Sequence, residues 1–281
     1  PEFTIKLLQQ SPDFLIDEIS QNLNTSLEKN YSINELMQVL RIAKAQIALS
    51  VAFADLSGLW TLEKITDALS KFAELSLTLS IDYLIHEAVK SGDLVHNLNA
   101  KDNLYHISHN SGYVILAMGK LGGFELNYSS DIDLIVLYDN DVVKYAGRKT
   151  GQDFFIKLTQ KMVKIMADRT ADGYVFRTDL RLRPDPGATP IALSMAGAEE
   201  YYQSVGLNWE RAAMIKARPI AGDIKAGYAF LERIRGFVWR KHLDYAALDD
   251  IHAIKKLIHK HHSHSHIQLS GHDVKLGRGG I

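Results

Sequence analysis

The chain has 281 residues, of which 46% are hydrophobic and 23% are charged. This length and composition allow a sizeable buried core in one or two domains and exclude a disordered chain. With 32 basic and 33 acidic residues the formal net charge is -1, so the overall field does not hold the protein to nucleic acid or to a membrane surface. Any phosphate-binding site must therefore be a local cluster of cations.

The sequence also bears on the compartment. It contains no cysteine, which excludes disulfides and thiolate chemistry and fits a cytoplasmic protein. No apolar run approaches the length expected of a membrane span, and the N-terminus lacks the pattern of a signal peptide. The chain begins at Pro1 and stops at Ile281, directly after a glycine-rich turn, which predicts a fragment of a longer protein.

The first hundred residues have a helical pattern. Apolar residues recur at helical spacing over 33–56 and again over 62–88, which predicts two long helices. Ser32 and Glu35 have the spacing of a capping box before the first helix, and Gly58 is its predicted stop. We expect these helices to pack antiparallel as a supporting layer without chemistry of its own.

The periodicity changes near residue 112. Short apolar runs predict strands at 113–118, 131–138, 173–180 and 189–193. Helical spacing returns at 154–168, and then at 195–205, 208–218, 222–241 and 248–262. The predicted fold class is therefore α+β, with a small sheet embedded in helices.

The strongest local signal is an acid pair at the start of the second predicted strand. Residues two apart in a strand face the same side, with Cα atoms roughly 6.6 Å apart. Asp131 and Asp133 can therefore converge on one cation while Ile132 enters the core. Their mutual repulsion is relieved by a hard divalent cation such as Mg²⁺.

Glycines and hydroxyls precede this acid pair. Gly119, Gly122 and Gly123 allow the backbone to approach a phosphate and to form an anion-binding nest of N–H groups. Ser129 and Ser130 add hydroxyl donors beside the carboxylates. Each feature alone is more typical of an ordinary turn or a solvated strand end, whereas their combination in one short segment favours a catalytic site.

Asp179 lies on the third predicted strand. Strand alternation places Arg181 and Arg183 on the same face as this carboxylate. The functional interpretation is a third metal ligand with two guanidinium groups ready for phosphate oxygens. The alternative is a structural ion-pair network. Pro184 and Pro186 stiffen the loop that follows.

Other charged residues keep more than one interpretation. Lys120 is a further candidate for binding phosphate. Lys216 and Arg218, in the helix predicted at 208–218, either face the phosphates or are solvated. Residues 209–211, Trp-Glu-Arg, favour a structural ion pair capped by an aromatic ring over a catalytic role.

The end of the chain carries a histidine cluster and two further cations. The cluster is either a metal site or, as we favour, a run of cations at a helix end, where they suit the helix dipole. Its members are His259, His261, His262, His264 and His266. Lys275 and Arg278 lie near the glycine-rich end and are candidates for reaching a nucleotide.

Four separated segments resemble one enzyme family, in that family's own order. They are AMGKLGGFELNYSSDIDLIVLYD (117–139), FRTDLRLRPDPGATP (176–190), NWERAAMIKARPIAGD (208–223) and HDVKLGRGGI (272–281). The family is the bifunctional glutamine synthetase adenylyltransferase/adenylyl-removing enzyme. The resemblance implies a DNA polymerase β-like nucleotidyltransferase fold with a small mixed sheet. In that fold Asp131, Asp133 and Asp179 match the metal-binding carboxylates, and two Mg²⁺ ions are expected.

The resemblance also implies an activity and partners. The family joins two nucleotidyltransferase domains: one adds AMP from ATP to a tyrosine of glutamine synthetase, and the other removes it with inorganic phosphate and releases ADP. The segments after Arg183, at 209–214 and at 275–281 resemble the N-terminal, adenylyl-removing half. Glutamine synthetase is then the partner, with the PII signalling protein as a further partner of the full-length enzyme. The second catalytic half and the regulatory region are expected to lie outside this fragment.

The resulting hypothesis is Mg²⁺-dependent phosphorolysis, with inorganic phosphate attacking in line at the α-phosphorus. Asp131, Asp133 and Asp179 are its catalytic residues; the nucleotide and phosphate ligands are Gly119, Lys120, Ser129, Ser130, Arg181 and Arg183. The expected domains are an N-terminal helical region (1–110), a nucleotidyltransferase domain (111–241) and a truncated C-terminal segment (242–281). The alternatives are the AMP-adding activity and an inactive module that binds glutamine synthetase. A uridylyltransferase fits the segments less well.

Overall fold

The computed structural model describes residues 11–27, 31–95, 107–142, 144–148 and 150–239, together with 252 and 256. Apart from those last two residues, the segment expected at 242–281 lies outside the described part of the chain. The whole histidine cluster, Lys275 and Arg278 lie outside it as well, so their roles stay as stated above.

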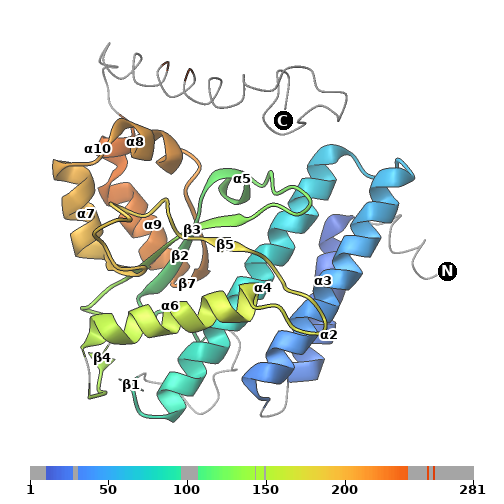
Figure 1. Cartoon of the computed structure of the whole chain (residues 1–281), viewed down its shortest axis with the longest axis horizontal. Coiled ribbons are helices and arrows are strands. Elements are labelled where there is room, and N and C mark those ends of the chain that lie inside the picture. Colours follow the sequence, from blue (N-terminus) through green and yellow to red (C-terminus); the bar gives the residue numbers. More distant parts are fainter. Residues whose placement is uncertain are drawn as a thin grey trace.

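The N-terminal layer consists of long helices that lie side by side (Figure 1). They are α2 (Pro12–Leu27), α3 (Ile33–Leu56) and α4 (Leu62–Lys90). The capping box before α3 is confirmed, because the Ser32 side chain accepts from the Glu35 amide and the Glu35 carboxylate accepts from the Ser32 amide at 2.7 Å. Gly58, at φ +68°, lies just past the end of α3, as predicted.

Helix α3 is apolar along much of its length. By length and composition alone it could cross a membrane, which corrects the expectation that no run reaches that length. The core helix of a folded domain passes the same test, and the inner face of α3 is of that kind: Leu36, Leu40 and Ile47 are fully buried in the core. On its outer face Leu49 and Phe53 are exposed.

A small mixed sheet lies at the centre of the molecule (Figure 1). Its strands are β2 (Tyr113–Ala117), β3 (Ile132–Tyr138), β5 (Thr178–Asp179), β6 (Leu193–Ser194) and β7 (Arg218–Gly222). β2 runs antiparallel to both β3 and β7, whereas β3 is parallel to β5 and to β6. The α+β class and the small mixed sheet are therefore confirmed. A separate antiparallel ladder joins β1 (Leu94–Val95) to β4 (Lys144–Tyr145).

Helices cover both faces of the sheet. Alternate residues of β2 point to opposite sides and pack against the helices on each face. Tyr113, Ile115 and Ala117 pack in the cluster that contains α2, α3, α4 and α6 (Gly151–Ala167). Val114 and Leu116 pack in the cluster formed by α7 (Met195–Ser204), α8 (Asn208–Met214), α9 (Ile224–Arg233) and α10 (Arg235–Val238). β2 is consequently buried at every position.

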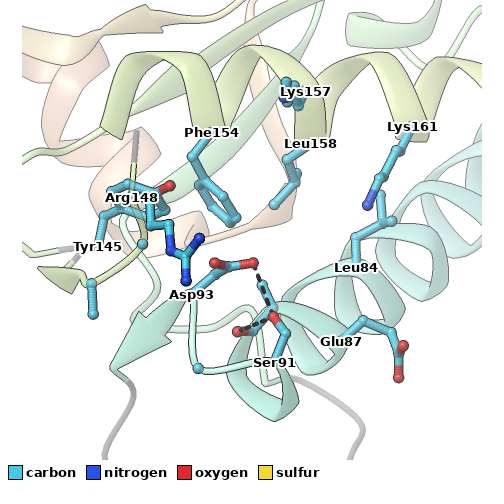
Figure 2. Close-up of a pocket in the computed structure, with 14 residues that line it drawn as sticks. Leu84, Glu87, Ser91, Asp93, Tyr145, Arg148, Phe154, Lys157, Leu158 and Lys161 are labelled. Carbon is cyan, nitrogen blue, oxygen red and sulfur yellow. Dashed lines mark hydrogen bonds between the residues drawn. The ribbon is translucent and has the colours of Figure 1, made fainter. Parts of the chain in front are cut away.

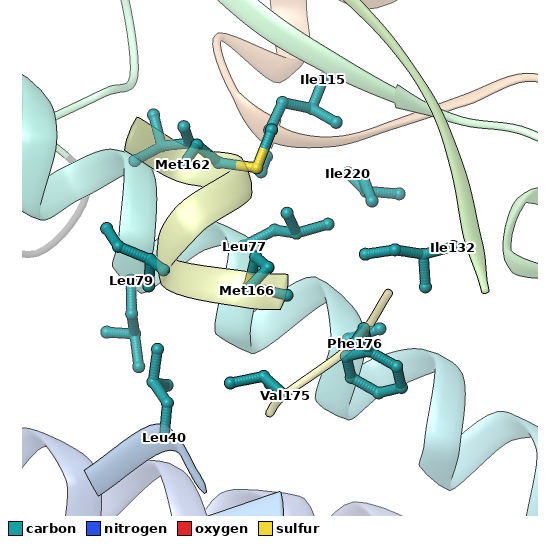
Figure 3. Packing of buried hydrophobic residues seen from close by; sticks show 14 of the residues in the cluster. Leu40, Leu77, Leu79, Ile115, Ile132, Met162, Met166, Val175, Phe176 and Ile220 are labelled. Atoms are coloured by element: carbon teal, nitrogen blue, oxygen red, sulfur yellow. The ribbon is translucent and has the colours of Figure 1, made fainter. Parts of the chain in front are cut away.

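The larger cluster crosses the boundary predicted at residue 110. Figure 3 shows Ile115 and Ile132 of the sheet close to Met162 and Met166 of α6, with Leu77 of α4 beside them. The N-terminal helices and the sheet thus share one hydrophobic core. The division of the chain into 1–110 and 111–241 stays a prediction.

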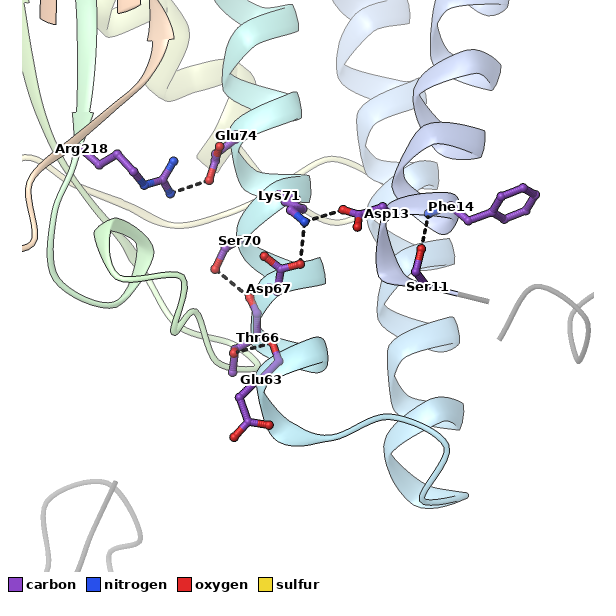
Figure 4. A network of polar contacts seen from close by, with 10 residues as sticks. All are labelled: Ser11, Asp13, Phe14, Glu63, Thr66, Asp67, Ser70, Lys71, Glu74 and Arg218. Atoms are coloured by element: carbon purple, nitrogen blue, oxygen red, sulfur yellow. Dashed lines mark hydrogen bonds and ion pairs between the residues drawn. The ribbon is translucent and has the colours of Figure 1, made fainter. Parts of the chain in front are cut away.

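Ion pairs tie α4 to its neighbours (Figure 4). Lys71 pairs with Asp13 of α2 and, at 2.7 Å, with Asp67 on its own helix. Glu74 pairs with Arg218 at the start of β7, at 2.6 Å. These contacts hold α4 between α2 and β7, the strand at the edge of the sheet.

Several predicted elements differ from the structure after residue 170. The strand predicted at 173–180 is only the two residues of β5, and the one at 189–193 is displaced to β6. The helix predicted at 208–218 ends at Met214, and β7 follows. β7 contains Pro219, which an edge strand tolerates, but which weakens the strand pattern in the sequence. At Gly222 (φ +81°) the chain turns into α9 and then α10, in place of one helix over 222–241.

Candidate active site

Three aspartates lie at one end of the sheet. In the parallel pair of β3 and β5, Asp133 is opposite Asp179 and Ile132 is opposite Thr178. Ile132 is fully buried in the larger core, so Asp133 and Asp131, which alternate with it, belong to the other face. Register and alternation together place the three acidic positions on one face of adjacent strands. We call this group the acid edge.

Asp131 is engaged by an arginine that the sequence analysis did not single out. Arg177 Nε makes an ion pair with Asp131 Oδ1, and its Nη2 donates to the carbonyl of Ser129 at 2.7 Å. The signal was present in the sequence, because Arg177 stands two residues before Asp179 in the predicted strand. Arg177 therefore fixes the loop that leads into β3.

Asp179 is engaged by Arg181, as its neighbourhood in the sequence suggested. Arg181 Nε lies 3.0 and 2.9 Å from the two carboxylate oxygens of Asp179, and its amide donates to Oδ1 at 2.8 Å. These hydrogen bonds lower the pKa of Asp179 below its usual value. Asp133 and Asp131 also act on the Arg181 guanidinium and help to raise its pKa. One cation thus lies in the field of all three carboxylates.

The acid edge is not preassembled as a metal site. Across the described part of the chain, no three His, Asp or Glu side chains are gathered so that they could hold a metal ion as they stand. The physical reason is that Asp131 and Asp179 each turn toward an arginine. The convergence of the three carboxylates on a metal ion therefore stays a prediction.

The donor set nevertheless suits a hard cation. Carboxylate oxygens are the ligands that Mg²⁺ prefers, and the guanidinium of Arg181 shows that the acid edge attracts positive charge. The Arg181 side chain is 83% exposed, so it can leave without disturbing the core. At Gly119 a Cβ would lie 3.1 Å from Asp133 Oδ2, so this glycine keeps the space beside that carboxylate open.

The glycine-rich segment forms a helical turn, α5 (Gly119–Gly122), rather than an open loop. Gly119 adopts φ +53°, which favours glycine. The amides of Gly122 and Gly123 donate to the carbonyls of Met118 and Gly119, at 3.0 and 3.2 Å. These two amides are thus used within the turn, and the anion-binding role of the segment stays a prediction. A Cβ on Gly122 would lie 2.0 Å from the Lys216 carbonyl, so close packing explains this glycine.

The other predicted ligands, Lys120, Ser129 and Ser130, lie in segments that adjoin the acid edge. Lys120 lies half-buried in α5, next to Gly119. Ser129 lies in a turn, has a φ of +53° itself, and contributes its carbonyl to Arg177. The Ser130 amide donates to the carbonyl of Asn127 at 3.3 Å. The phosphate-binding roles of the Lys120, Ser129 and Ser130 side chains stay predictions.

Arg183 does not continue the strand alternation expected from Asp179, and its phosphate-binding role stays a prediction. Its guanidinium donates to the carbonyls of Leu180 and Pro186, each at 2.8 Å, and to that of Thr189 at 3.1 Å. Burial lowers its pKa. These contacts assign Arg183 to the loop that follows β5, because the strand ends at Asp179 and its alternation does not continue to residue 183.

Lys216 and Arg218, for which the sequence allowed two interpretations, are both paired with acidic side chains. Arg218 donates to Glu74, and its guanidinium lies 3.7 Å from the centre of the Phe124 ring. Lys216 pairs with Glu125 at 2.5 Å. Neither side chain is directed to the acid edge by these contacts, so they connect α4, α5 and β7 instead.

Glu210 is buried, but not in the ion pair expected within residues 209–211. Its carboxylate accepts from the hydroxyl of Tyr201 at 3.1 Å and from the amide of Leu207 at 2.8 Å. Burial raises the pKa of Glu210. The segment is therefore structural, as predicted, although the partners of the carboxylate differ.

Comparisons with known proteins identify the family. A model described as glutamate-ammonia ligase adenylyltransferase matches residues 3–233. Three relatives named bifunctional glutamine synthetase adenylyltransferase/adenylyl-removing enzyme are 52%, 50% and 45% identical to this chain. They come from Rhizobium meliloti (strain 1021), Agrobacterium fabrum (strain C58 / ATCC 33970) and Mesorhizobium japonicum (strain LMG 29417 / CECT 9101 / MAFF 303099).

The matches cover most of this chain but a small part of each relative. They span 88%, 88% and 100% of the chain, and 24%, 25% and 28% of the respective relatives. The chain thus corresponds to about a quarter of the length of these proteins, and it includes the acid edge described above. On this evidence the chain belongs to the glutamate-ammonia ligase adenylyltransferase family.

Proposed function

We propose that this chain is a nucleotidyltransferase domain that removes AMP from adenylylated glutamine synthetase by Mg²⁺-dependent phosphorolysis. The family supports a nucleotidyltransferase, because its relatives are named for adding and removing adenylyl groups on glutamine synthetase. The observation that carries the proposal is the β3–β5 register, which sets Asp179 beside Asp133. A mixed sheet with this arrangement is compatible with the DNA polymerase β-like fold, which belongs to the proposal.

The direction of the reaction rests on the resemblance of particular segments. Residues 184–190 and 209–214 resemble the adenylyl-removing half rather than the AMP-adding half. In the proposed reaction an oxygen of inorganic phosphate forms a bond to the α-phosphorus. The bond from that phosphorus to the tyrosine oxygen breaks, and the tyrosine oxygen takes up a proton. The products are ADP and unmodified tyrosine.

The residues at and beside the acid edge have different roles in this proposal. Asp131, Asp133 and Asp179 would hold two Mg²⁺ ions, which when bound neutralise charge on the attacking and leaving oxygens. Arg181 is exposed and paired only at the surface, so it can exchange the Asp179 carboxylate for a phosphate oxygen. Lys120, in the adjacent turn, would bind a second phosphate oxygen. Glutamine synthetase is the proposed partner, PII the proposed regulator of the full-length protein, and the cytoplasm the proposed compartment.

The first prediction tests the acid edge. Asp133→Asn removes one negative charge from the centre of the three carboxylates, so the release of ADP from adenylylated glutamine synthetase should fall roughly a hundredfold or more. The measurement is ADP formed with Mg²⁺ and phosphate. Asp139→Asn is the matched control, because Asp139 directly follows the other end of β3 and lies in a turn, where its Oδ1 accepts from the Asp141 amide. An Asp133→Asn variant that turns over at the parental rate would exclude this site.

The alternatives give different products in parallel assays. Labelling of unmodified glutamine synthetase by labelled ATP, without ADP release from the adenylylated form, would identify the AMP-adding activity. A folded chain that binds glutamine synthetase but shows neither reaction, and no Mg²⁺-dependent binding of nucleotide, would be the inactive module. ADP release that requires both Mg²⁺ and phosphate is the result expected here.

A further inference from the structure

A cavity of about 670 Å³ lies away from the acid edge, between α4 and α6. Figure 2 shows it where the last turns of α4 face the first turns of α6, with the β1–β4 ladder beside them. The acid edge is at the start of β3, whereas β4 and α6 follow the far end of that strand. Asp131, Asp133 and Asp179 are not among the residues that line the cavity. It is therefore a separate site.

Regular helix faces build the cavity. Leu84, Ala88 and Ser91 stand four and three residues apart on and just after α4, so they share one face. Phe154 and Leu158 do the same on α6. The apolar residues among them, Leu84, Ala88, Phe154 and Leu158, give the cavity an apolar wall. Tyr145 of β4 extends that wall, with its ring centre 5.1 Å from that of Phe154.

In the described part of the chain, the acidic residues around this wall are paired, whereas two of the basic residues are not. The acids have partners: Asp93 accepts from the hydroxyl of Ser91 at 3.0 Å, and Glu87 lies 3.7 Å from Lys90. Among the residues that the structure describes, Arg148 and Lys161 have no hydrogen bond or ion pair. Figure 2 shows these two cations extending toward the cavity, Arg148 from the segment after β4 and Lys161 from α6.

A second feature of α6 adds positive charge to the same place. Lys157 and Lys161 are one helical turn apart, and both line the cavity. Like charges at this spacing repel each other on a helix. An anion beside Lys161 and Arg148 would offset these two positive charges, whereas a cation or a neutral apolar ligand would not.

We propose that this cavity binds a small organic anion with a flat apolar portion. Its phosphate, sulfonate or carboxylate group lies between Arg148 and Lys161, and its apolar portion lies against Phe154 and Leu158. The volume is within the range of about 300–1,000 Å³ that is typical of small-molecule sites. The proposal does not depend on the reaction at the acid edge. A ligand held here would bridge α4 and α6, which also support the sheet.

The test uses 8-anilinonaphthalene-1-sulfonate as the probe, because it combines flat aromatic rings with one anionic group. Fluorescence titration of the full chain at pH 7 should show saturable binding with one site per chain. The double variant Arg148→Glu, Lys161→Glu should weaken that binding at least tenfold. Lys161→Gln, which removes one charge without reversing it, should weaken it about threefold.

The matched control is Lys164→Glu, because Lys164 is exposed on the same helix but does not line the cavity. It should bind the probe as the parent does. Circular dichroism and the thermal transition show that each variant is folded, which separates a folded site from the general probe binding of loosened proteins. Binding that is not saturable in the parent, or equal affinities for the double variant and Lys164→Glu, would overturn the proposal.

Discussion

Two carboxylates of the acid edge are paired with arginines, so a metal ion must compete with these arginines to bind. Arg181 binds Asp179 through its amide and its guanidinium, whereas Arg177 joins Asp131 to the carbonyl of Ser129. The side chains of Arg177 and Asp131 are 55% and 48% exposed, so water screens their attraction. A divalent ion can therefore displace Arg177 at a small cost.

The second prediction follows from that competition. Arg177→Gln removes the competing cation, so the affinity for Mn²⁺ or Mg²⁺ should rise, by up to about fivefold if the exposed pair contributes about 0.2–1 kcal/mol. Isothermal titration calorimetry gives the affinity directly. Arg169→Gln is the matched control, because it makes the same charge change while its guanidinium lies over Tyr174. Weaker binding by Arg177→Gln, or equal changes in both variants, would show that Arg177 does not compete.

The third prediction concerns pH and Lys44. Its Nζ lies 3.8 Å from the centre of the Phe176 ring, and burial lowers the pKa of Lys44 to about 8, from 10.5. The unfolded chain therefore binds more protons than the folded chain between those two pH values, and the stability contributed by this residue rises with pH across that window. Below it the buried charge destabilises the fold by about 1–3 kcal/mol, since the ring offsets part of the cost.

Lys44→Met should remove this effect. The variant should be more stable than the parent at pH 7, and its free energy of unfolding should lose the rise between pH 8 and 10.5, the window set by the shifted and ordinary pKa of Lys44. Urea denaturation at pH 7 and at pH 10 measures both. Lys64→Met, at an exposed position of α4, is the control and should keep the rise. An unchanged rise in Lys44→Met would assign the pH dependence to another group.

At the scale of elements, α5 positions the acid edge through close backbone packing. A Cβ on Gly122 would lie 2.0 Å from the carbonyl oxygen of Lys216 and 2.9 Å from that of Ala117. Because both neighbours are backbone atoms, they cannot rotate away. The turn that carries Gly119 and Lys120 would have to move instead.

The fourth prediction is that Gly122→Ala destabilises the protein by about 1–3 kcal/mol, measured by urea denaturation. Gly123→Ala is the matched control: its Cβ would meet the side chain of Lys216 at 3.2 Å, which can shift. This control should lie close to the parent. Equal stability of the two variants would mean that α5 moves freely and does not depend on contact with residue 216.

At the scale of the whole molecule, one buried arginine joins the N-terminal layer to the strand that carries Asp179. Arg41 of α3 is 1% exposed. It donates to the carbonyls of Gly173 at 2.9 Å and Ile165 at 3.1 Å, and also to that of Asp168. These acceptors lie at the end of α6 and in the turn before β5, so α3 helps to place the acid edge from outside the sheet.

The fifth prediction tests this connection. Arg41→Met removes the donor from one buried and three part-buried carbonyls, so the free energy of unfolding should fall by about 3 kcal/mol. Urea denaturation is the measurement. Arg235→Met, at an exposed arginine paired with Glu232 on the surface, should change it by less than about 1 kcal/mol. Loss of equal size in both variants, or no loss in Arg41→Met, would contradict the role given to Arg41.

Local periodicity was sufficient for the long elements. The helices at 33–56 and 62–90, and the strands around Ile115 and Ile135, repeat apolar residues often enough that the sequence predicts them without knowledge of their neighbours. The acid pair at Asp131 and Asp133 was also visible, because residues two apart in a strand share a face. The match of separated segments was enough to indicate the family.

Only the tertiary structure decided how these parts meet. β5 and β6 have two residues each, too few for a periodic pattern, and they exist because β3 pairs with them. Asp131 pairs with an arginine 46 residues away, and Arg41 donates to three carbonyls that are 124 or more residues away, separations over which local spacing carries no information. Arg183 turned to the loop carbonyls because its strand ended early. The sequence by itself determined which residues are charged. The pairing of the strands determined which charged residues face one another.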